Sequence, residues 1–162
     1  MPAPAKELNP YAKFLGDAPP HDVLEMTAIT IARLIRNSDA EQLTRAPAPG
    51  KWSIRDIICH LADCEITFAF RLRQTMAESH HVIQPFDQQA WASPYGALDA
   101  HDALDAFSAI RRWNLLFIRA VGDAAESKPV THPERGEMTF RNIVETMGGH
   151  DINHLRQIEN LV

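Results

Sequence analysis

Residues 143–161 read IVETMGGHDINHLRQIENL, and this stretch decides the fold of the chain. Apolar side chains and two histidines recur along it in steps of 4, 3, 4, 4 and 3 residues. Because an α-helix turns once in about 3.6 residues, this spacing places all of them on one face. Thr139 can cap such a helix. The inward face is predicted to carry Ile143, Met147, His150, His154, Ile158 and Leu161.

Three further long helices are predicted, with a short helix between the first and the second of them. Helical spacing covers residues 21–37, 54–76 and 99–121, and Gly122 ends the last of these. Ser53 can cap the second long helix, where Trp52 occupies the position of a hydrophobic staple. Ser38 opens a capping-box pattern for a short helix through Leu43. Four long helices with almost no strand signal predict an all-α four-helix bundle.

Long connecting segments separate the helices. Residues 1–19 lack periodicity and are predicted to form an irregular N-terminal arm, and residues 20–162 the bundle domain. Residues 77–98 form a loop of about 22 positions, a length more typical of functional loops or lids than of simple connections. Within it, Phe86 and Trp91 are interpreted as loop anchors. A second loop covers residues 123–138.

The composition narrows the class of protein. The 162 residues, 45% of them hydrophobic, suit one domain with a full core. The formal charge of −5 and the scattered arginines argue against nucleic-acid binding. No apolar run reaches the roughly 18–20 residues of a membrane span, and the N-terminus has no secretory core. Cys59 and Cys64 form no CxxC motif, and we expect a cytoplasmic protein.

The histidines on the last predicted helix have the spacing of metal ligands. His150 and His154 are four residues apart, so one helix can present both imidazoles to an ion. His60 borders the apolar face of the helix at 54–76 and is a candidate third ligand, or else a core histidine bonded to a carbonyl. Asp63 and Asp151 either accept the second ring N–H of a ligand or are solvated.

Other notable residues have plainer interpretations. Cys64 can reach the site but is read as a small buried hydrophobe. Gly148 and Gly149 each cost about 1 kcal/mol in a helix. Close approach of a neighbouring helix, room for a metal, or a helix start or bend would explain the pair. Asn114 is an interior polar group or a satisfied core amide. The remaining histidines are expected to be solvated: His21, His80, His81, His101 and His132.

Several segments together resemble the DinB-like (DinB/YfiT) superfamily: residues 50–56 (GKWSIRD), 60–65 (HLADCE), 86–88 (FDQ), 132–139 (HPERGEMT) and 149–158 (GHDINHLRQI). The resemblance implies a four-helix bundle, often dimeric, that holds a divalent metal through three histidines. Carried over residue by residue, the ligands are His60, His150 and His154. Similar members include S-transferases and isomerases that use low-molecular-weight thiols such as bacillithiol or mycothiol.

These observations favour a metal-dependent enzyme of the thiol S-transferase type, acting with a low-molecular-weight thiol and an electrophilic substrate, as a homodimer. Three imidazoles do not distinguish zinc, nickel and iron, and no general acid or base is assigned. One alternative is a non-enzymatic, metal-stabilised stress or interaction protein. Another is a zinc-protease-like hydrolase built on His150-Asp151-x-x-His154, which is disfavoured because aspartate is one methylene shorter than the usual glutamate.

Overall fold

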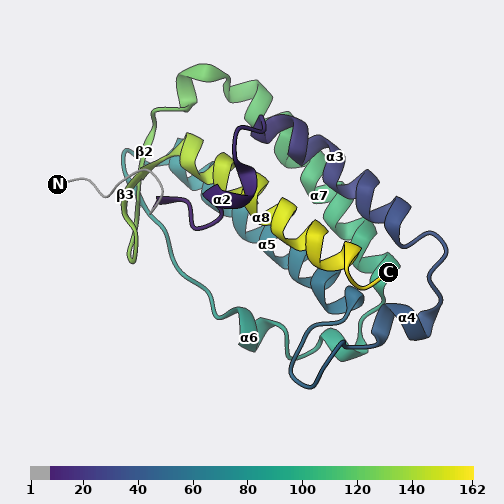
Figure 1. Cartoon of the computed structure of the whole chain (residues 1–162). Coiled ribbons are helices and arrows are strands. Elements are labelled where there is room, and N and C mark those ends of the chain that lie inside the picture. Colours follow the sequence, from purple (N-terminus) through teal and green to yellow (C-terminus); the bar gives the residue numbers. More distant parts are fainter. Residues whose placement is uncertain (1–7) are drawn as a thin grey trace.

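The computed structural model describes residues 8–162 and confirms the predicted bundle (Figure 1). Its long helices are α3 (Pro20–Leu34), α5 (Ile54–Ala77), α7 (Ala100–Val121) and α8 (Phe140–Glu159). Helices α3 and α5 each pack against both α7 and α8, so the contacts run in a closed ring. The bundle core therefore receives side chains from all four helices.

Side-chain caps fix where the helices begin. Ser53 and Asp56 form a capping box at the start of α5, and Thr139 and Asn142 form another at the start of α8. Both caps were predicted at these positions. The short helix α4 (Ala40–Thr44) is capped by Asp39, whose carboxylate accepts from the backbone N–H of Gln42. The predicted capping by Ser38 is therefore wrong by one residue.

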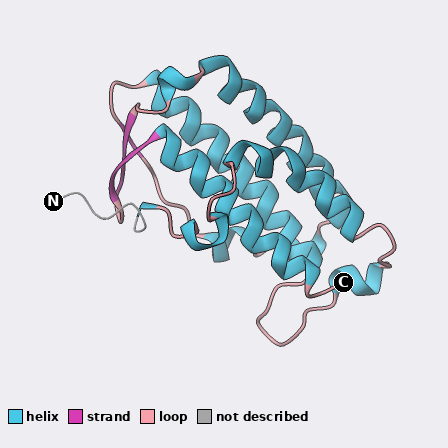
Figure 2. Cartoon of the chain, turned by 45° about the horizontal axis from the view of Figure 1, so that its top comes forward, coloured by secondary structure: helices cyan, strands magenta, loops and turns pink. Residues whose placement is uncertain are grey.

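A small sheet closes one end of the bundle and was not predicted (Figure 2). Strand β2 (Pro129–His132) pairs in parallel with β1 (His81–Val82) and antiparallel with β3 (Gly136–Thr139). Gly136, with φ of 86°, begins β3 at the tight turn after β2. The strands have two to four residues, at or below the lower limit of the four to eight residues over which alternation is recognised. The two long connections also contain α6 (Gln88–Trp91) and the 3-10 turns η1 (Tyr95–Ala97) and η2 (Asp123–Ala125).

The predicted irregular arm contains a short helix, α2 (Ala12–Leu15), that packs on α8. Residues 1–7 of that arm lie outside the described residues. A Cβ atom added to Gly149 would lie 2.5 Å from the backbone oxygen of Tyr11. One added to Gly148 would lie 3.1 Å from a methyl group of Leu15. Close approach thus explains both glycines, and α8 does not begin there. The N-terminal arm makes the approach at Gly149, whereas at Gly148 Pro20, the first residue of the long helix α3, also approaches, with its Cβ atom 3.3 Å away.

A layer of polar side chains crosses the bundle between two apolar clusters. One cluster gathers around Ile54, Phe107 and Ile158, and the other around Phe68, Leu115 and Met147. Every long helix contributes to what we call the polar layer, all of whose members are buried: Thr27, His60, Glu65, Arg111, Asn114, His150, Asp151 and His154. Burying so many polar groups is costly unless they satisfy one another or a ligand. Function is therefore to be sought in this layer.

No helix within residues 8–162 combines the length and the apolar character needed to cross a bilayer. The long helices are amphipathic instead, and outside the polar layer many of their charged side chains lie on the outer faces, as in the exposed pair between Arg119 on α7 and Glu25 on α3.

Candidate metal centre

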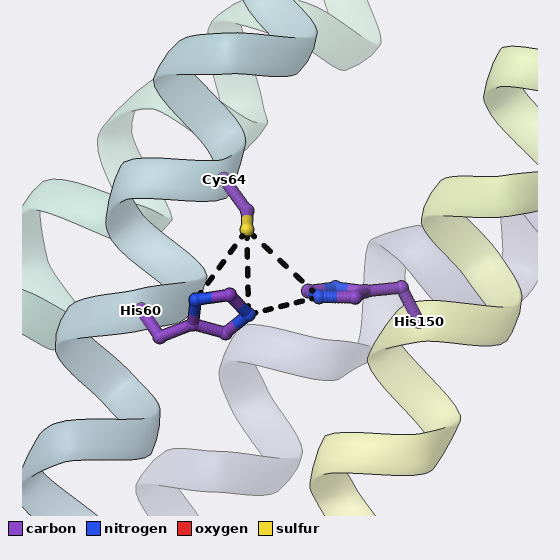
Figure 3. A group of neighbouring side chains, drawn as sticks. All are labelled: His60, Cys64 and His150. Carbon is purple, nitrogen blue, oxygen red and sulfur yellow. Dashed lines mark hydrogen bonds between the residues drawn. The ribbon is translucent and has the colours of Figure 1, made fainter. Parts of the chain in front are cut away.

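Three imidazole rings converge in the polar layer, which we call the imidazole cluster (His60, His150 and His154). The Nε2 atom of His150 lies 3.1 Å from Nε2 of His60 and 3.2 Å from Nε2 of His154. His60 comes from α5 and the other two from α8, and Figure 3 shows His60 and His150 pointing toward each other across the gap between these helices. All three are candidate ligands in the sequence, and the structure brings them together.

The donor set fits a divalent metal ion. Where metal–nitrogen bonds are about 2.0–2.1 Å long, neighbouring nitrogen ligands lie roughly 3.0–3.4 Å apart, close to the spacing found here. Burial, and then the neighbouring His154, lower the pKa of His60 to about 3. Burial also lowers the pKa of His154 and, most strongly, that of His150. Neutral imidazole is the form that ligates metals, so the environment favours the binding state.

Gln157 fixes the ring of His154. Its Oε1 atom lies 2.8 Å from Nδ1 of His154, and because an amide oxygen only accepts, Nδ1 carries the proton. The Nε2 atom that faces the cluster then has a free lone pair. The prediction that Asp63 or Asp151 accepts a second ring N–H is wrong for both residues. Asp63 accepts from the Tyr95 hydroxyl, and Asp151 is engaged elsewhere. The i, i+3 spacing from His154 was the signal that could have found Gln157.

Cys64 lies closer to the imidazoles than the interpretation as a simple core residue implies. Its Sγ atom is 3.4 Å from Nε2 of His60 and 3.8 Å from Nε2 of His150 (Figure 3). The thiol is buried, and burial raises its pKa far above the usual range. His60, Cys64 and His150 thus offer three donor atoms within 4.8 Å of one another. A soft sulfur donor next to imidazoles suits zinc and other first-row metals.

Aromatic side chains wall the cluster. The Trp52 ring lies 4.7 Å from the ring of His60 and 6.5 Å from that of His154. On the other side Tyr11, from the N-terminal arm, meets His150 edge to face at 5.1 Å. Trp52 therefore lines the site, in addition to the staple position that the sequence suggested. A pocket of about 620 Å³ opens beyond it and includes Trp52 and Gln157 among its lining residues.

Arg111 holds the two ligand helices together in what we call the ionic cluster (Glu65, Arg111 and Asp151). Its guanidinium donates at 2.7 and 2.9 Å to the carboxylate of Glu65 and at 2.6 and 3.1 Å to that of Asp151. Burial alone would lower the pKa of Arg111, but the two carboxylates outweigh it and raise that pKa. Glu65 follows Cys64 and Asp151 follows His150. The cluster therefore ties α5 to α8 beside the imidazoles.

The ionic cluster was not predicted from the sequence. The position of Arg111 on the inward face of its helix was the signal that could have revealed it. Arg111 lies four residues after Phe107 and seven before Ile118, both buried on the inner face of α7. Asn114, read as an interior polar group or core amide, is fully buried and donates to Glu65. Its Oδ1 accepts from Arg73 at 2.7 Å. Asn114 thus extends the ionic cluster and does not touch the imidazoles.

Two further histidines were wrongly expected to be solvated. His81 and His132 are 6% and 5% exposed, because β1 and β2 carry them into the small sheet against the end of the bundle. Phe86 and Trp91, interpreted as loop anchors, pack on each other at 4.8 Å. Phe86 also packs against the second apolar cluster, whereas Trp91 is 41% exposed.

The fold and the site together identify the protein as a helical bundle with a buried cluster of three histidines. Residues 24–158 match the family model of the DinB superfamily, and the chain belongs to that superfamily. The resemblance seen in the sequence is thereby confirmed.

Relatives and a solved structure agree with this assignment. A protein of Oceanobacillus iheyensis named "Putative metal-dependent hydrolase" is 29% identical over 137 residues, covering 81% of this chain and 79% of its own. A protein of Bacillus mycoides with the same name is 28% identical over 134 residues, covering 81% and 76%. The structure of YfiT from Bacillus subtilis superposes with a TM-score of 0.81 at 21% identity, covering 88% of this chain and 83% of that one. YfiT is described as a probable metal-dependent hydrolase with an unusual four-helix bundle topology.

Proposed function

We propose that the chain is a metal-dependent enzyme of the thiol S-transferase type whose ion is held by His60, His150 and His154. The convergence of three Nε2 atoms carries the proposal. Nε2 of His150 has one lone pair or one proton, and two ring nitrogens at about hydrogen-bond distance compete for it. A shared cation satisfies all three at once. A divalent ion bound there stabilises a thiolate at neutral pH.

A thiol suits this site better than water as the nucleophile. A bound divalent ion lowers the pKa of its water to about 7, but an HExxH-type hydrolase also uses a nearby carboxylate as a base. Here the acidic residues next to the ligands are committed: Asp151 to Arg111 and Thr27, and Asp63 to Tyr95. A thiol ionises near pH 8.5 and needs much less help. Asp151 also points away from the imidazoles into the ionic cluster, so it does not take the role of the glutamate in an HExxH hydrolase.

Hydrolysis is the second candidate because the curated relatives carry that name. A purely structural ion is the third, and the position of Cys64 favours it: a site closed by four protein ligands leaves no place for a substrate. Thiol transfer, hydrolysis and a purely structural ion predict different results for the same set of variants.

The metal is tested first. Tag-free protein is analysed for first-row metals and compared with His150→Ala and with His101→Ala, a matched variant at an exposed histidine of α7. We expect stoichiometric metal in the wild type and in His101→Ala, and its loss in His150→Ala. Equal metal contents in the two variants would refute the site.

The reaction is tested on metal-loaded and metal-free protein. Candidate low-molecular-weight thiols are screened by thermal shift and then assayed with electrophiles, and ester and amide substrates are assayed without thiol. Thiol transfer predicts a thiol that raises the melting temperature of the loaded protein alone. Hydrolysis without any thiol effect would favour the second candidate. If Cys64→Ser loses metal as fully as His150→Ala and neither activity is found, the structural role stands.

We further propose that the protein works as a cytoplasmic homodimer. Cys59 and Cys64 are free thiols, which suits a reducing compartment. Large apolar side chains are exposed on α5 and α7, among them Phe70 at 55% and Trp113 at 63%, and a partner would cover them. Sedimentation of the full chain at micromolar concentration tests the dimer, and a monomer there would contradict it.

A further inference from the structure

Two arginines gather near the sheet end of the bundle without an acidic partner. Arg71 lies on α5, and Arg135 lies in the turn between β2 and β3. Of the ion pairs formed within residues 8–162, none includes either arginine. One Nη atom of Arg71 reaches the carbonyl of Gln84 at 3.4 Å, and its Nε atom is buried without a hydrogen-bond partner. Such an orphaned buried donor calls for an explanation.

The surroundings make the two charges unfavourable for the protein alone. Burial and then the charge of Arg135 lower the pKa of Arg71. Burial and then both guanidiniums lower the pKa of His132, which lies beside them. Phe68 and Phe86 are 6.0 and 5.9 Å from the guanidinium carbon of Arg71, at the outer limit of a cation–π contact. Fold stability does not account for this pair of cations.

A small pocket lies between the two arginines and borders the metal centre. Its lining includes Arg71, His132, Arg135 and Thr146, and its volume is about 10 Å³. That is room for about one water-sized group, such as a single oxygen atom of an oxyanion. Phe68, which also lines it, has its ring 6.1 Å from the ring of His150. Phe68 therefore adjoins both the pocket and the imidazole cluster.

We propose that Arg71 and Arg135 form a subsite for an anionic oxygen group, a carboxylate or a phosphate, on the substrate that reaches the metal centre. Guanidinium groups match both oxyanions with paired N–H donors, and one oxygen fills the pocket while the rest of the group remains at its mouth. The anion satisfies the orphaned Nε atom and cancels the repulsion between the two cations. That the anion belongs to a substrate rests on the proposed function; the binding of an oxyanion does not.

The test uses sodium phosphate and sodium acetate as separate probes on the full chain, metal-free and metal-loaded, at constant ionic strength. We expect at least one probe to raise the melting temperature saturably, by about 3–6 °C at ten times its Kd. The probe that saturates at lower concentration distinguishes phosphate from carboxylate. Arg71→Met and Arg135→Met should abolish the response, Arg71→Lys should retain part of it, and Arg36→Met, at an exposed arginine beyond α3, should retain all of it.

A second readout separates a binding role from a structural one. Because each arginine is an uncompensated charge, Arg71→Met and Arg135→Met should melt at or above the wild-type temperature when no anion is present. A fall in that temperature, no saturable response to either probe, or equal responses in Arg71→Met and Arg36→Met would overturn the subsite. Metal content is measured in the same samples, so that loss of metal with intact anion binding counts against the proposed function alone.

Discussion

The imidazole cluster and the ionic cluster both use α5 and α8, to which the ionic cluster adds Arg111 of α7, but they are completed in opposite ways. The side chains of Cys64 and His150 point into the imidazole cluster. Those of Glu65 and Asp151, the next residues along the chain, point toward Arg111. In the ionic cluster every charged group meets an opposite charge within the fold. In the imidazole cluster the Nε2 atoms that face one another can all act as acceptors, and no positively charged side chain among the described residues lies between them. A satisfied polar cluster holds structure together, and an incomplete one marks where a ligand binds.

The largest expected effect comes from breaking the ionic cluster. Arg111→Met leaves two buried carboxylates unpaired and should lower the free energy of unfolding by about 3–5 kcal/mol. Arg119 lies on the same helix α7 and forms an exposed ion pair with Glu25 of α3. Arg119→Met breaks this pair and should lower the free energy of unfolding by less than about 1 kcal/mol. Urea unfolding of the metal-free proteins measures both. Similar losses would mean that Arg111 is not a buried tie between the helices.

The second-largest effect is expected when the pH is lowered, because the imidazole cluster then destabilises the fold. The pKa values of His60, His150 and His154 lie below 6.5 in the folded chain, so the unfolded chain binds more protons as the pH falls. Their contribution to stability is complete above about pH 7 and is lost as the pH falls from 6.5 toward 3. Between pH 7 and 5.5 the loss at His60, whose pKa is lowered to about 3, should be about 1 kcal/mol, and His150 and His154 add to it.

Urea unfolding of metal-free protein at the two pH values measures this loss. His150→Phe has one imidazole fewer and should lose less stability than the wild type over the same range. An unchanged pH dependence in that variant would show that the acid sensitivity arises elsewhere.

A methyl group at Gly149 tests how tightly the arm covers the imidazole cluster. In Gly149→Ala the new Cβ would lie 2.5 Å from the Tyr11 oxygen, so backbone must move. We expect a steric cost of about 1–3 kcal/mol, partly offset by the roughly 1 kcal/mol that alanine gains in a helix. In Gly148→Ala the nearest atom is the end of the flexible Leu15 side chain, so thermal unfolding should find this variant close to neutral.

The smallest effect on the stability of the fold is expected from a change at the rim of the imidazole cluster. Gln157→Ala removes the acceptor that orients His154 and should lower metal affinity by about 10–100-fold. Stability of the metal-free protein should change little, because Gln157 is largely exposed. Competition with a chromophoric chelator measures the affinity, and Glu159→Ala at an exposed position of the same helix is the matched control. Equal affinities in the two variants would remove Gln157 from the site.

Periodicity and caps made much of this molecule predictable. The steps through Met147 and Ile158 placed His150 and His154 inside the bundle, and Ser53 and Thr139 cap the helices as predicted. His60 was harder to place because one histidine at the edge of an apolar face has a plain structural reading. Short strands escaped notice because two to four residues carry no periodic signal, and with them the burial of His81 and His132 was missed.

Which residues share a helix, and which face of that helix is buried, can be read from the sequence, because both follow from a local repeat of 3.6 residues. Only the tertiary structure decided which buried faces meet. It placed His60 against His150 across 90 positions of sequence, Arg111 between two carboxylates, and Tyr11 over Gly149. Those pairings depend on how the helices pack and on the registers between them, and helical periodicity contains no information about either.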